Sequence, residues 1–560
     1  MNDQRGASST DINMFQVLDS LDCELKVTRA PPRNIPRIVQ EAPEAPAGRA
    51  KKRILCAGQV NSNTARVAGA SSIVGFSPQD LEPENASQTD ARDHHGQRAD
   101  EATEPKQECE YTWGNADGAA FKAALEETYA EVVHWRRNIF MVPSGAAGKE
   151  FVREISRLFD SFTQQSALEA ISIRAIMTMP HLLLQKPDVK SKAKEHLKVL
   201  ERRLVAWRNG DIQELVLEGR AIQSHLSTWS QTRKRTSEET LARSFGNLIH
   251  QGRVRAALRL LDNSQVRGGV LPLDAVIPEA DGKCVRQVLR EKHPKGEAAQ
   301  QEVLLDEPIQ STPPASHHPV LFHQITAESI RAAALRVEGA AGPSGIDACG
   351  WRRMCTSFGS ASDDLCRSLA DFARRICSET VLDHYLSTYV ACRLVPLDKS
   401  PGVRPIGICE VVRRIVGKAA LQVVGACVQR AAGTTQLCAG QPMGIEAGIH
   451  AMQRIYDEDD CEAILMVDAA NAFNRINRKA ALHNSATLCP AIATLLNNTY
   501  NSSADLFVGG EVLNSEEGVT QGDPLAMAMY ALGTVPLINE LAKHVRTKQV
   551  WYADDASDGR

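Results

Sequence analysis

The sequence is poor in aromatic residues and has no long apolar run. Phe, Trp and Tyr make up 5% of its 560 residues, so we expect a core of Ala, Val, Leu and Ile. No apolar run reaches the roughly 18 residues that cross a bilayer, and the N-terminal residues lack the apolar segment of a signal peptide. We therefore expect a soluble, intracellular protein that does not associate with a membrane, in either the nucleus or the cytoplasm.

Closely spaced cysteines are also missing. The 14 cysteines are scattered and none forms a CxxC pair, which argues against a zinc module or a disulfide framework and favours a reducing compartment. The net charge of −4 neither predicts nor excludes a nucleic-acid partner, because such binding needs a local basic face and not a basic total.

Composition divides the chain into four predicted regions. Residues 1–112 are rich in Pro, Ala, Glu and Ser, and we expect them to be disordered because they bury too little apolar surface to offset the entropy of ordering. Residues 113–263 carry apolar residues at steps of three and four, which predicts helices of unassigned role. Residues 264–325 are predicted to be a linker, and residues 326–560 hold the motifs.

Three polar clusters outside the motifs have plain interpretations. Lys51–Arg53 is favoured as a solvated patch, with a nuclear-import signal as the alternative, and we assign no metal to His317–His318. The end of the helical region is locally basic, and a solvated helix face is favoured there over an RNA-contacting face. Its basic residues are Arg233, Lys234, Arg235, Arg243, Arg253, Arg255 and Arg259.

Aspartates follow two apolar, strand-like runs. Asp468 ends the first run, and Asp554 and Asp555 lie at the tip of a predicted hairpin in "QVWYADDASDG". Adjacent carboxylates repel each other unless a cation lies between them. If Asp468 converges on the pair, the oxygens suit Mg²⁺, or Mn²⁺ in its place, and two such ions activate a 3′-hydroxyl and stabilise the leaving pyrophosphate. For Asp468 alone, a helix N-cap is the alternative.

Two further stretches suit phosphate chemistry. In "TQGDPL", Gly522 lets the backbone approach a ligand closely, and Pro524 fits the first position of a helix. In "LDKSPGVRPIGI", a predicted hairpin carries Lys399 at its tip and Arg404 on the return strand, where the guanidinium suits a triphosphate. A capped turn and an ordinary exposed hairpin are the alternatives.

In this order, the motifs resemble the fingers and palm of a reverse transcriptase of the non-LTR retrotransposon type. They run "GPSGID", "KSPGVRPIGI", "QPMGIEAGIHAMQRI", "VDAANAFN", "TQGDPLAMAMY" and "YADD", within residues 326–560. The resemblance implies an α/β (α+β) right-hand polymerase palm and fingers, preceded by an all-α region and a disordered N-terminus. It also implies an RNA-directed DNA polymerase that uses two Mg²⁺ ions to add dNTPs to a DNA or RNA primer on an RNA template.

The resemblance also implies roles for single residues. Asp468, Asp554 and Asp555 become the catalytic carboxylates and metal ligands, with Asp555 the least critical. Phe473 corresponds to an aromatic gate against the 2′-hydroxyl of ribonucleotides, with a core position as its alternative. The other implied substrate-binding residues are Lys399 and Arg404 at the triphosphate, Gln521 and Gly522 at the nucleotide and template, and Tyr552 at the primer end. Arg414 and Lys418 are assigned with equal weight to the template backbone or to a solvated face.

The chain departs from the family at its end. Five residues follow the second aspartate of "YADD", whereas the family continues with further palm strands and a thumb. We therefore expect a fragment of a polymerase. The alternatives are a maturase-like reverse transcriptase of a group II intron, a viral RNA polymerase, and an inactive relic or RNA-binding remnant. Viral RNA polymerases usually carry GDD and lack an aromatic residue at the position of Phe473.

Overall fold

The computed structural model describes residues 23–29, 118–232, 238–254, 257–258, 260, 269–301, 304–305, 319–399, 402–458, 461, 463–544 and 548–559. The prediction of disorder for residues 1–112 was wrong at Cys23–Arg29, which form a strand because their backbone pairs with residues 463–469. The other predictions for residues 1–112 lie outside the described part of the chain, as do those for His317–His318 and for all of the basic cluster except Arg243 and Arg253. No helix in the described residues is long and apolar enough to cross a membrane.

Helices dominate residues 118–250, in the range where the sequence predicts them. In α3, Phe151, Ile155, Phe159 and Phe162 recur at steps of three and four and are fully buried, which is the pattern of a helix that packs on one face. The helices are α2 (Gly118–Val132), α3 (Ala146–Thr163), α4 (Glu169–Leu183), α5 (Ala193–Asn209), α6 (Ile212–Thr232) and α7 (Glu238–His250).

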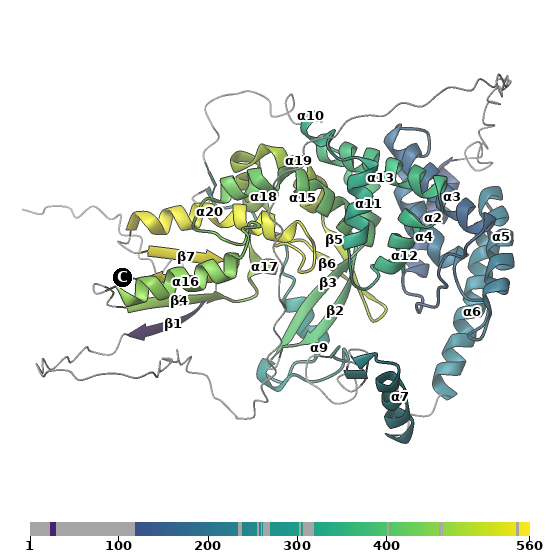
Figure 1. The fold of residues 1–560 in the computed structure, drawn as a ribbon, viewed down its shortest axis with the longest axis horizontal. Coiled ribbons are helices and arrows are strands. Elements are labelled where there is room, and N and C mark those ends of the chain that lie inside the picture. Colours follow the sequence, from purple (N-terminus) through teal and green to yellow (C-terminus); the bar gives the residue numbers. More distant parts are fainter. Residues whose placement is uncertain are drawn as a thin grey trace, which may run out of the picture. The chain divides into compact units, whose positions relative to one another are not determined.

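A second series of helices follows (Figure 1). Thr326 caps α11, because its hydroxyl accepts a hydrogen bond from the Ser329 backbone N–H at 3.3 Å. The series comprises η2 (Pro278–Ala280), α9 (Val285–Glu291), α10 (Pro319–Phe322), α11 (Ala327–Arg336), α12 (Ala348–Thr356), α13 (Ser360–Ser378), α14 (Asp383–Val390), α15 (Val411–Ala432), α16 (Gly444–Asp457), α17 (Ala472–Arg475), α18 (Arg478–Leu488), α19 (Pro490–Tyr500) and α20 (Ala526–His544).

The described strands form two sheets of four strands each. The first sheet has the order β1-β4-β8-β7 and is antiparallel throughout, and the second has the order β3-β2-β5-β6, in which β2 and β5 are parallel. The strands are β1 (Cys23–Arg29), β2 (Cys392–Asp398), β3 (Val403–Cys409), β4 (Ala463–Ala469), β5 (Ala504–Val508), β6 (Glu511–Ser515), β7 (Lys548–Tyr552) and β8 (Asp555–Gly559). The described protein is therefore a largely helical, mixed α/β structure.

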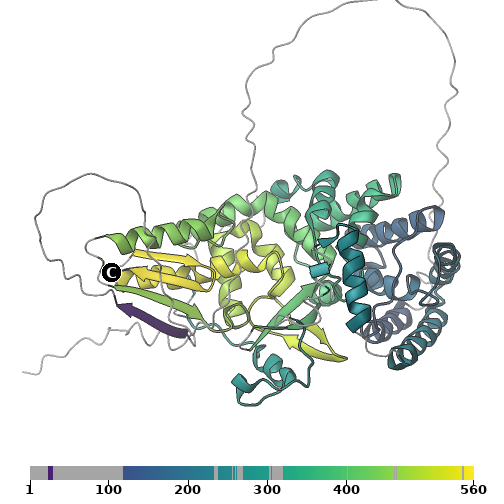
Figure 2. The ribbon, with the colours of Figure 1, turned by 60° about the horizontal axis from the view of Figure 1, so that its bottom comes forward.

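Helix α16 packs against β7 and β8 of the first sheet, as Figures 1 and 2 show. Gly444, at the start of this helix, is buried and closely surrounded. A Cβ atom there would lie 2.6 Å from the carbonyl oxygen of Leu437 and 3.2 Å from the ring of Tyr552 in β7, whereas one at Gly448 would lie 3.4 Å from a methyl group of Val550. Gly444 thus allows the start of the helix to approach the strand before the two aspartates.

One hydrophobic cluster runs through both series of helices. It extends from Leu125 in α2 to Ala553 beside the acidic turn, and includes the packing of Phe159 on Phe372 of α13, with ring centroids 5.1 Å apart. The predicted boundary near residue 263 therefore does not separate two cores.

The predicted linker of residues 264–325 is packed over much of its described length. Ile277, Val285 and Leu289 are buried in a second cluster with Leu394 and Val403 of the second sheet. The backbone N–H of Leu271 also donates to the carbonyl of Pro396. The Pro and Gly residues of this segment suggested a free connector, but its apolar residues cover one face of β2 and β3, so residues 269–301 belong to the folded structure.

Candidate functional site

The three predicted carboxylates meet on the first sheet. Asp468, near the end of β4, lies directly opposite Asp555, the first residue of β8. Residues directly opposite each other in an antiparallel pair project on the same face, with Cβ atoms about 5 Å apart. Asp554 precedes Asp555 in the two-residue turn between β7 and β8, and its carbonyl accepts from the Ala469 N–H at 3.4 Å.

The charges of this cluster act on one another. Burial raises the pKa of Asp554, and nearby Asp468 raises it further, whereas Lys399 and Arg404 lower it. Burial likewise raises the pKa of Asp555, to which Asp554 and Asp468 both add. Charges alter a neighbour's pKa only at short range. The acidic turn, the end of β4 and the cationic hairpin therefore share one site, although they are far apart in the sequence.

The cluster does not form a ready-made metal site. Among the described residues, no three His, Cys, Asp or Glu side chains are placed to hold one ion. The donor chemistry nevertheless fits Mg²⁺, which prefers carboxylate oxygens and retains several waters. Burial is the main cause of the raised pKa values of Asp554 and Asp555, and repulsion between the carboxylates adds to it; a bound dication would relieve that repulsion. The carboxylates would therefore have to rearrange to hold the expected Mg²⁺ or Mn²⁺.

The predicted cationic hairpin is present as β2 and β3. Its turn is closed by the Lys399 N–H donating to the Gly402 carbonyl at 3.0 Å, and Arg404 lies opposite Leu397. Both cationic side chains are exposed, as a surface that receives an anion requires.

The structure adds Lys292 to this cationic group. Its pKa is lowered first by burial and then by the charge of Lys399. Its backbone carbonyl accepts from Asn471, three residues after Asp468, at 2.9 Å. No local sequence pattern pointed to this residue, because it lies in the segment assigned to the linker.

The Gln521–Gly522 turn is fixed against β3. The Gly407 N–H donates to the Gln521 carbonyl at 3.0 Å. Gly522 has φ +108°, and a Cβ atom there would lie 2.8 Å from the Gly407 carbonyl oxygen. The glycine is needed because of its φ and because the two chains approach so closely.

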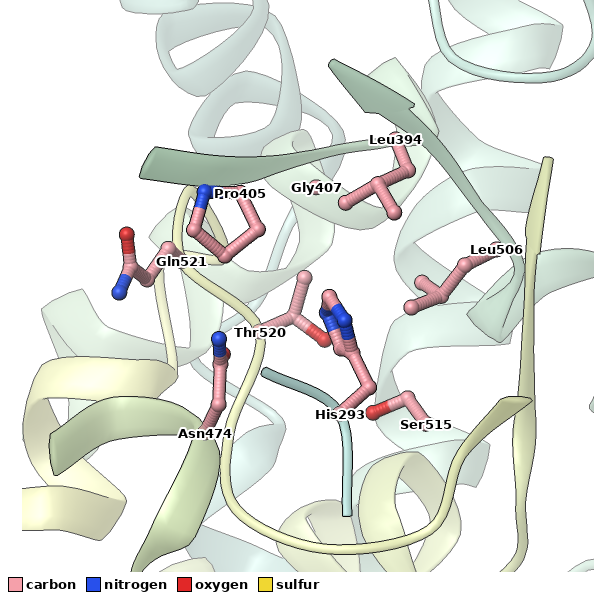
Figure 3. Close-up of a pocket in the computed structure, with 9 residues that line it drawn as sticks. All are labelled: His293, Leu394, Pro405, Gly407, Asn474, Leu506, Ser515, Thr520 and Gln521. Atoms are coloured by element: carbon pink, nitrogen blue, oxygen red, sulfur yellow. The ribbon is translucent and has the colours of Figure 1, made fainter. Parts of the chain in front are cut away.

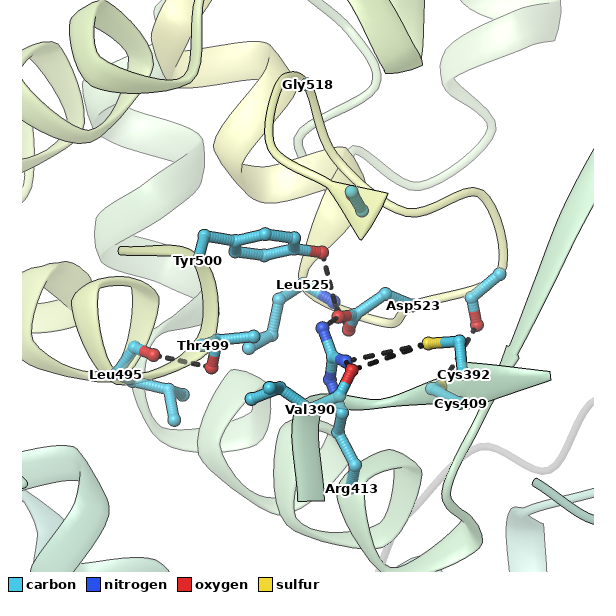
Figure 4. Close-up of polar contacts among 12 residues, drawn as sticks. Val390, Cys392, Cys409, Arg413, Leu495, Thr499, Tyr500, Gly518, Asp523 and Leu525 are labelled. Atoms are coloured by element: carbon cyan, nitrogen blue, oxygen red, sulfur yellow. Dashed lines mark hydrogen bonds and ion pairs between the residues drawn. The ribbon is translucent and has the colours of Figure 1, made fainter. Parts of the chain in front are cut away.

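Asp523 anchors this turn to the core (Figure 4). Its carboxylate is fully buried, forms an ion pair with Arg413 of α15, and accepts from the Tyr500 hydroxyl at 2.8 Å and the Leu525 N–H at 2.9 Å. Helix α20 runs from Ala526, two residues after Pro524, and the Asp523 carboxylate caps its N-terminal end by accepting from the Leu525 N–H.

A small cavity lies beside the turn, between the two strands of the hairpin and β5 (Figure 3). Its volume of about 10 Å³ is room for about one water, so it is no nucleotide pocket. In Figure 3 the Gln521 amide points away from its centre. The lining residues are His293, Leu394, Pro405, Gly407, Asn474, Leu506, Ser515, Thr520 and Gln521.

Two predicted aromatic residues lie at the edge of the core. Phe473 is half-buried and stacks on Tyr530 of α20, with ring centroids 4.7 Å apart and an angle of 21° between the rings. Tyr552 is half-buried, packs on the large cluster, and pairs with Asp555 across the hairpin. One side of the Phe473 ring therefore packs in the core, as the core interpretation predicts. The part of the ring that stays exposed is compatible with the gate interpretation.

Arg414 and Lys418 have structural partners. Arg414 donates to the carbonyl of Glu338 at 2.6 Å, and Lys418 donates to the carbonyl of Arg336 at 3.2 Å. Cations at these positions satisfy the free carbonyls that follow α11. Neither prediction, a template contact or a merely solvated face, included this role.

Comparison of the sequence with protein-family models and with curated proteins finds no match. The functional argument therefore rests on the residues and their geometry.

Proposed function

We propose that residues 326–560 form the fingers and palm of a reverse transcriptase of the retrotransposon type. The reaction is the addition of dNTPs to the 3′-hydroxyl of a DNA or RNA primer paired with an RNA template. The observation that carries the proposal is the pairing of Asp468 with Asp555, beside Asp554 and two cations that lower its pKa. A site with three carboxylates and adjacent cations suits phosphoryl transfer, in which positioning and charge stabilisation supply most of the catalysis.

Each part of the site has a separate task. Asp468, Asp554 and Asp555 would hold Mg²⁺ or Mn²⁺, which supplies charge neutralisation at the phosphate and lowers the pKa of the attacking hydroxyl. Lys399 and Arg404 bind the triphosphate. The guanidinium of Arg404 is suited to two parallel hydrogen bonds with phosphate oxygens. Gln521 and Gly522 orient the nucleotide and template.

The aromatic residues set selectivity and primer position in this proposal. The exposed part of Phe473 faces the sugar of the incoming nucleotide, and the Tyr530 ring supports it from behind. A 2′-hydroxyl therefore clashes with the Phe473 ring. Tyr552 supports the primer end next to the two aspartates. These roles come from the resemblance to the family and are compatible with the positions of the two rings.

Primer extension tests the proposal. The protein is incubated with an RNA template, a DNA primer, dNTPs and Mg²⁺, beside an Asp468→Asn variant. We expect extension that needs Asp468 and that falls sharply when ribonucleotides replace deoxyribonucleotides. Equal use of the two nucleotide classes would remove the gate role of Phe473.

Binding of a dNTP with Mn²⁺ separates the remaining outcomes. Binding that depends on Asp468 without extension indicates the inactive-relic alternative, in which the site persists without turnover. Absence of both binding and extension in a folded protein contradicts the proposed function. Extension that persists in the Asp468→Asn variant also contradicts it, because the assigned carboxylate is then dispensable.

A further inference from the structure

The backbone at residues 435–438 lies along β7, next to the acidic turn. Gln436 forms a parallel bridge with Trp551. The Leu437 N–H donates to the Trp551 carbonyl at 2.8 Å, and the Trp551 N–H donates to the Thr435 carbonyl at 2.9 Å. This short segment thus extends the first sheet beyond β7 and holds the strand before Asp554 on its outer edge.

The Gln436 side chain reaches into the turn itself. It is fully buried, and its Oε1 accepts from the Ala553 N–H at 3.0 Å. Its Nε2 donates to the Ala553 carbonyl at 3.3 Å and to the Thr534 hydroxyl of α20 at 3.2 Å. One amide therefore satisfies both backbone groups of the residue between Tyr552 and Asp554. It also links the turn to α20, the helix after the Gln521–Gly522 turn.

Ala553 needs such support because its backbone is strained. Its φ is +56°, in the left-handed region that residues with a Cβ atom rarely adopt. The residue is buried, so its N–H and carbonyl cannot turn to water when an internal partner is missing. The two hydrogen bonds between Gln436 and Ala553 therefore help to hold the residue in this conformation.

We propose that Gln436 is a positioning residue for the acidic turn. By fixing the backbone of Ala553, it sets the direction in which the Asp554 side chain projects from the turn. It also keeps Asp555 in register with Asp468. The catalytic purpose of the aspartates in this inference rests on the proposed function. The contact of Gln436 with Ala553, which we call the clamp, rests on the hydrogen bonds alone. A neutral amide suits the task because it offers a donor and an acceptor at the spacing of the backbone groups, and adds no charge beside the carboxylates.

The test compares three variants in the full chain. Gln436→Met removes both bonds while keeping the approximate length of the side chain. Gln436→Glu keeps the acceptor, loses the donor and adds a negative charge. Gln213→Met is the matched control, because Gln213 is exposed on α6. Mn²⁺ affinity from electron paramagnetic resonance and amide hydrogen exchange over residues 548–559 are measured for each.

We expect Mn²⁺ to bind at least tenfold more weakly in both Gln436 variants, as is typical when a residue that orients a metal ligand is lost. Exchange over residues 548–559 should accelerate in both, while exchange in α3 stays unchanged. A second substitution, Ala553→Gly in the Gln436→Met background, should recover part of the affinity, because glycine adopts positive φ without strain. A merely structural role in the core would not be rescued at the turn.

The outcomes distinguish the clamp from the function. Unchanged exchange and unchanged Mn²⁺ affinity in Gln436→Met overturn the clamp, and so does a loss of protection throughout the chain that Ala553→Gly leaves unrepaired. If the unsubstituted protein binds no Mn²⁺, the proposed function fails. The clamp is then judged by exchange alone, and is supported by faster exchange at the turn that slows again with Ala553→Gly.

Discussion

Two buried carboxylates illustrate how individual residues hold the site. Asp523 forms an ion pair with a buried guanidinium and accepts a hydrogen bond from a hydroxyl. Glu410, at the end of the cationic hairpin, instead accepts hydrogen bonds from two neutral donors, the N–H and the hydroxyl of Ser344, at 2.6 and 2.7 Å. Burial raises the pKa of Glu410 to about 7, even though Ser344 and two arginines oppose the shift.

Glu410 should make stability depend on pH. Because its pKa is higher in the folded chain than the usual 4.5, its stabilisation is complete below pH 4.5 and is lost as the pH rises through about 7. A shift of this size predicts a loss of about 2–3 kcal/mol between pH 5 and 8, measured by urea unfolding. Glu410→Gln should lack this loss and exposed Glu446→Gln should retain it, whereas equal slopes for all three proteins would contradict the assignment.

The Arg413–Asp523 pair should be costly to break. Arg413→Met leaves the Asp523 carboxylate buried with only the Tyr500 hydroxyl and a backbone N–H as partners. Removing one member of a buried pair typically lowers the free energy of unfolding by about 3–5 kcal/mol. Lys543→Met, which breaks an exposed ion pair with Glu540, should change it by less than about 1 kcal/mol. Similar midpoints of urea unfolding for the two variants would refute the anchoring role.

At the scale of elements, the site depends on three turns that lie close together. They are the β2–β3 turn with its cations, the Gln521–Gly522 turn bound to β3, and the β7–β8 turn with the aspartates. The first and second are linked through Gly407, and the third is held by Gln436. Strands fix the backbone at both ends of the first and third turns, and the second is held by its bond to Gly407. Small changes within a turn should therefore affect the site strongly.

A pair of glycine substitutions tests this view of the turns. Gly522→Ala puts a Cβ atom 2.8 Å from a carbonyl oxygen at φ +108°, which should destabilise the protein by about 1–3 kcal/mol. Gly425→Ala, in the middle of α15 with nothing within 4 Å of the new atom, should instead stabilise it by about 0.5–1 kcal/mol. Thermal unfolding measures both. Effects of the same sign would show that the strain at the turn is absent.

At the scale of the whole described chain, the N-terminal helices and the site share one core. Phe162 also packs on Phe372, with ring centroids 5.4 Å apart, so α3 contacts α13 through more than one aromatic ring. Helix α13 in turn contacts α15, which carries Arg413 at the site. We infer that helices α2 to α6 support the site mechanically.

Removing one ring from this contact should therefore destabilise both regions together. Phe159→Ala should lower the free energy of unfolding by about 3–5 kcal/mol, and hydrogen exchange in α3 and in β7–β8 should accelerate by the same factor. The control Val205→Ala removes a side chain that is 59% exposed and should change stability by less than about 0.5 kcal/mol. Acceleration confined to α3 would mean that the two regions unfold independently.

Local patterns predicted the elements of the site better than their partners. The apolar run before Asp468 and the turn residues around Lys399 signalled β4 and the β2–β3 hairpin, because period and turn chemistry are local. The Gln436–Ala553 contact spans 117 residues, and no single stretch encodes it. Residues 269–301 were assigned to a linker for the same reason, since only the second sheet gives their apolar residues a surface to cover.

Titration with Mn²⁺, followed by electron paramagnetic resonance, is the most direct test of the central claim that Asp468, Asp554 and Asp555 act together. The account predicts bound Mn²⁺ in the unsubstituted protein, further tightened by a dNTP. It also predicts a loss of at least tenfold in affinity in Asp468→Asn and in Asp554→Asn, a smaller loss in Asp555→Asn, and unfolding midpoints that are not lowered. A folded protein that binds no Mn²⁺, or whose affinity is the same without these carboxylates, would contradict it.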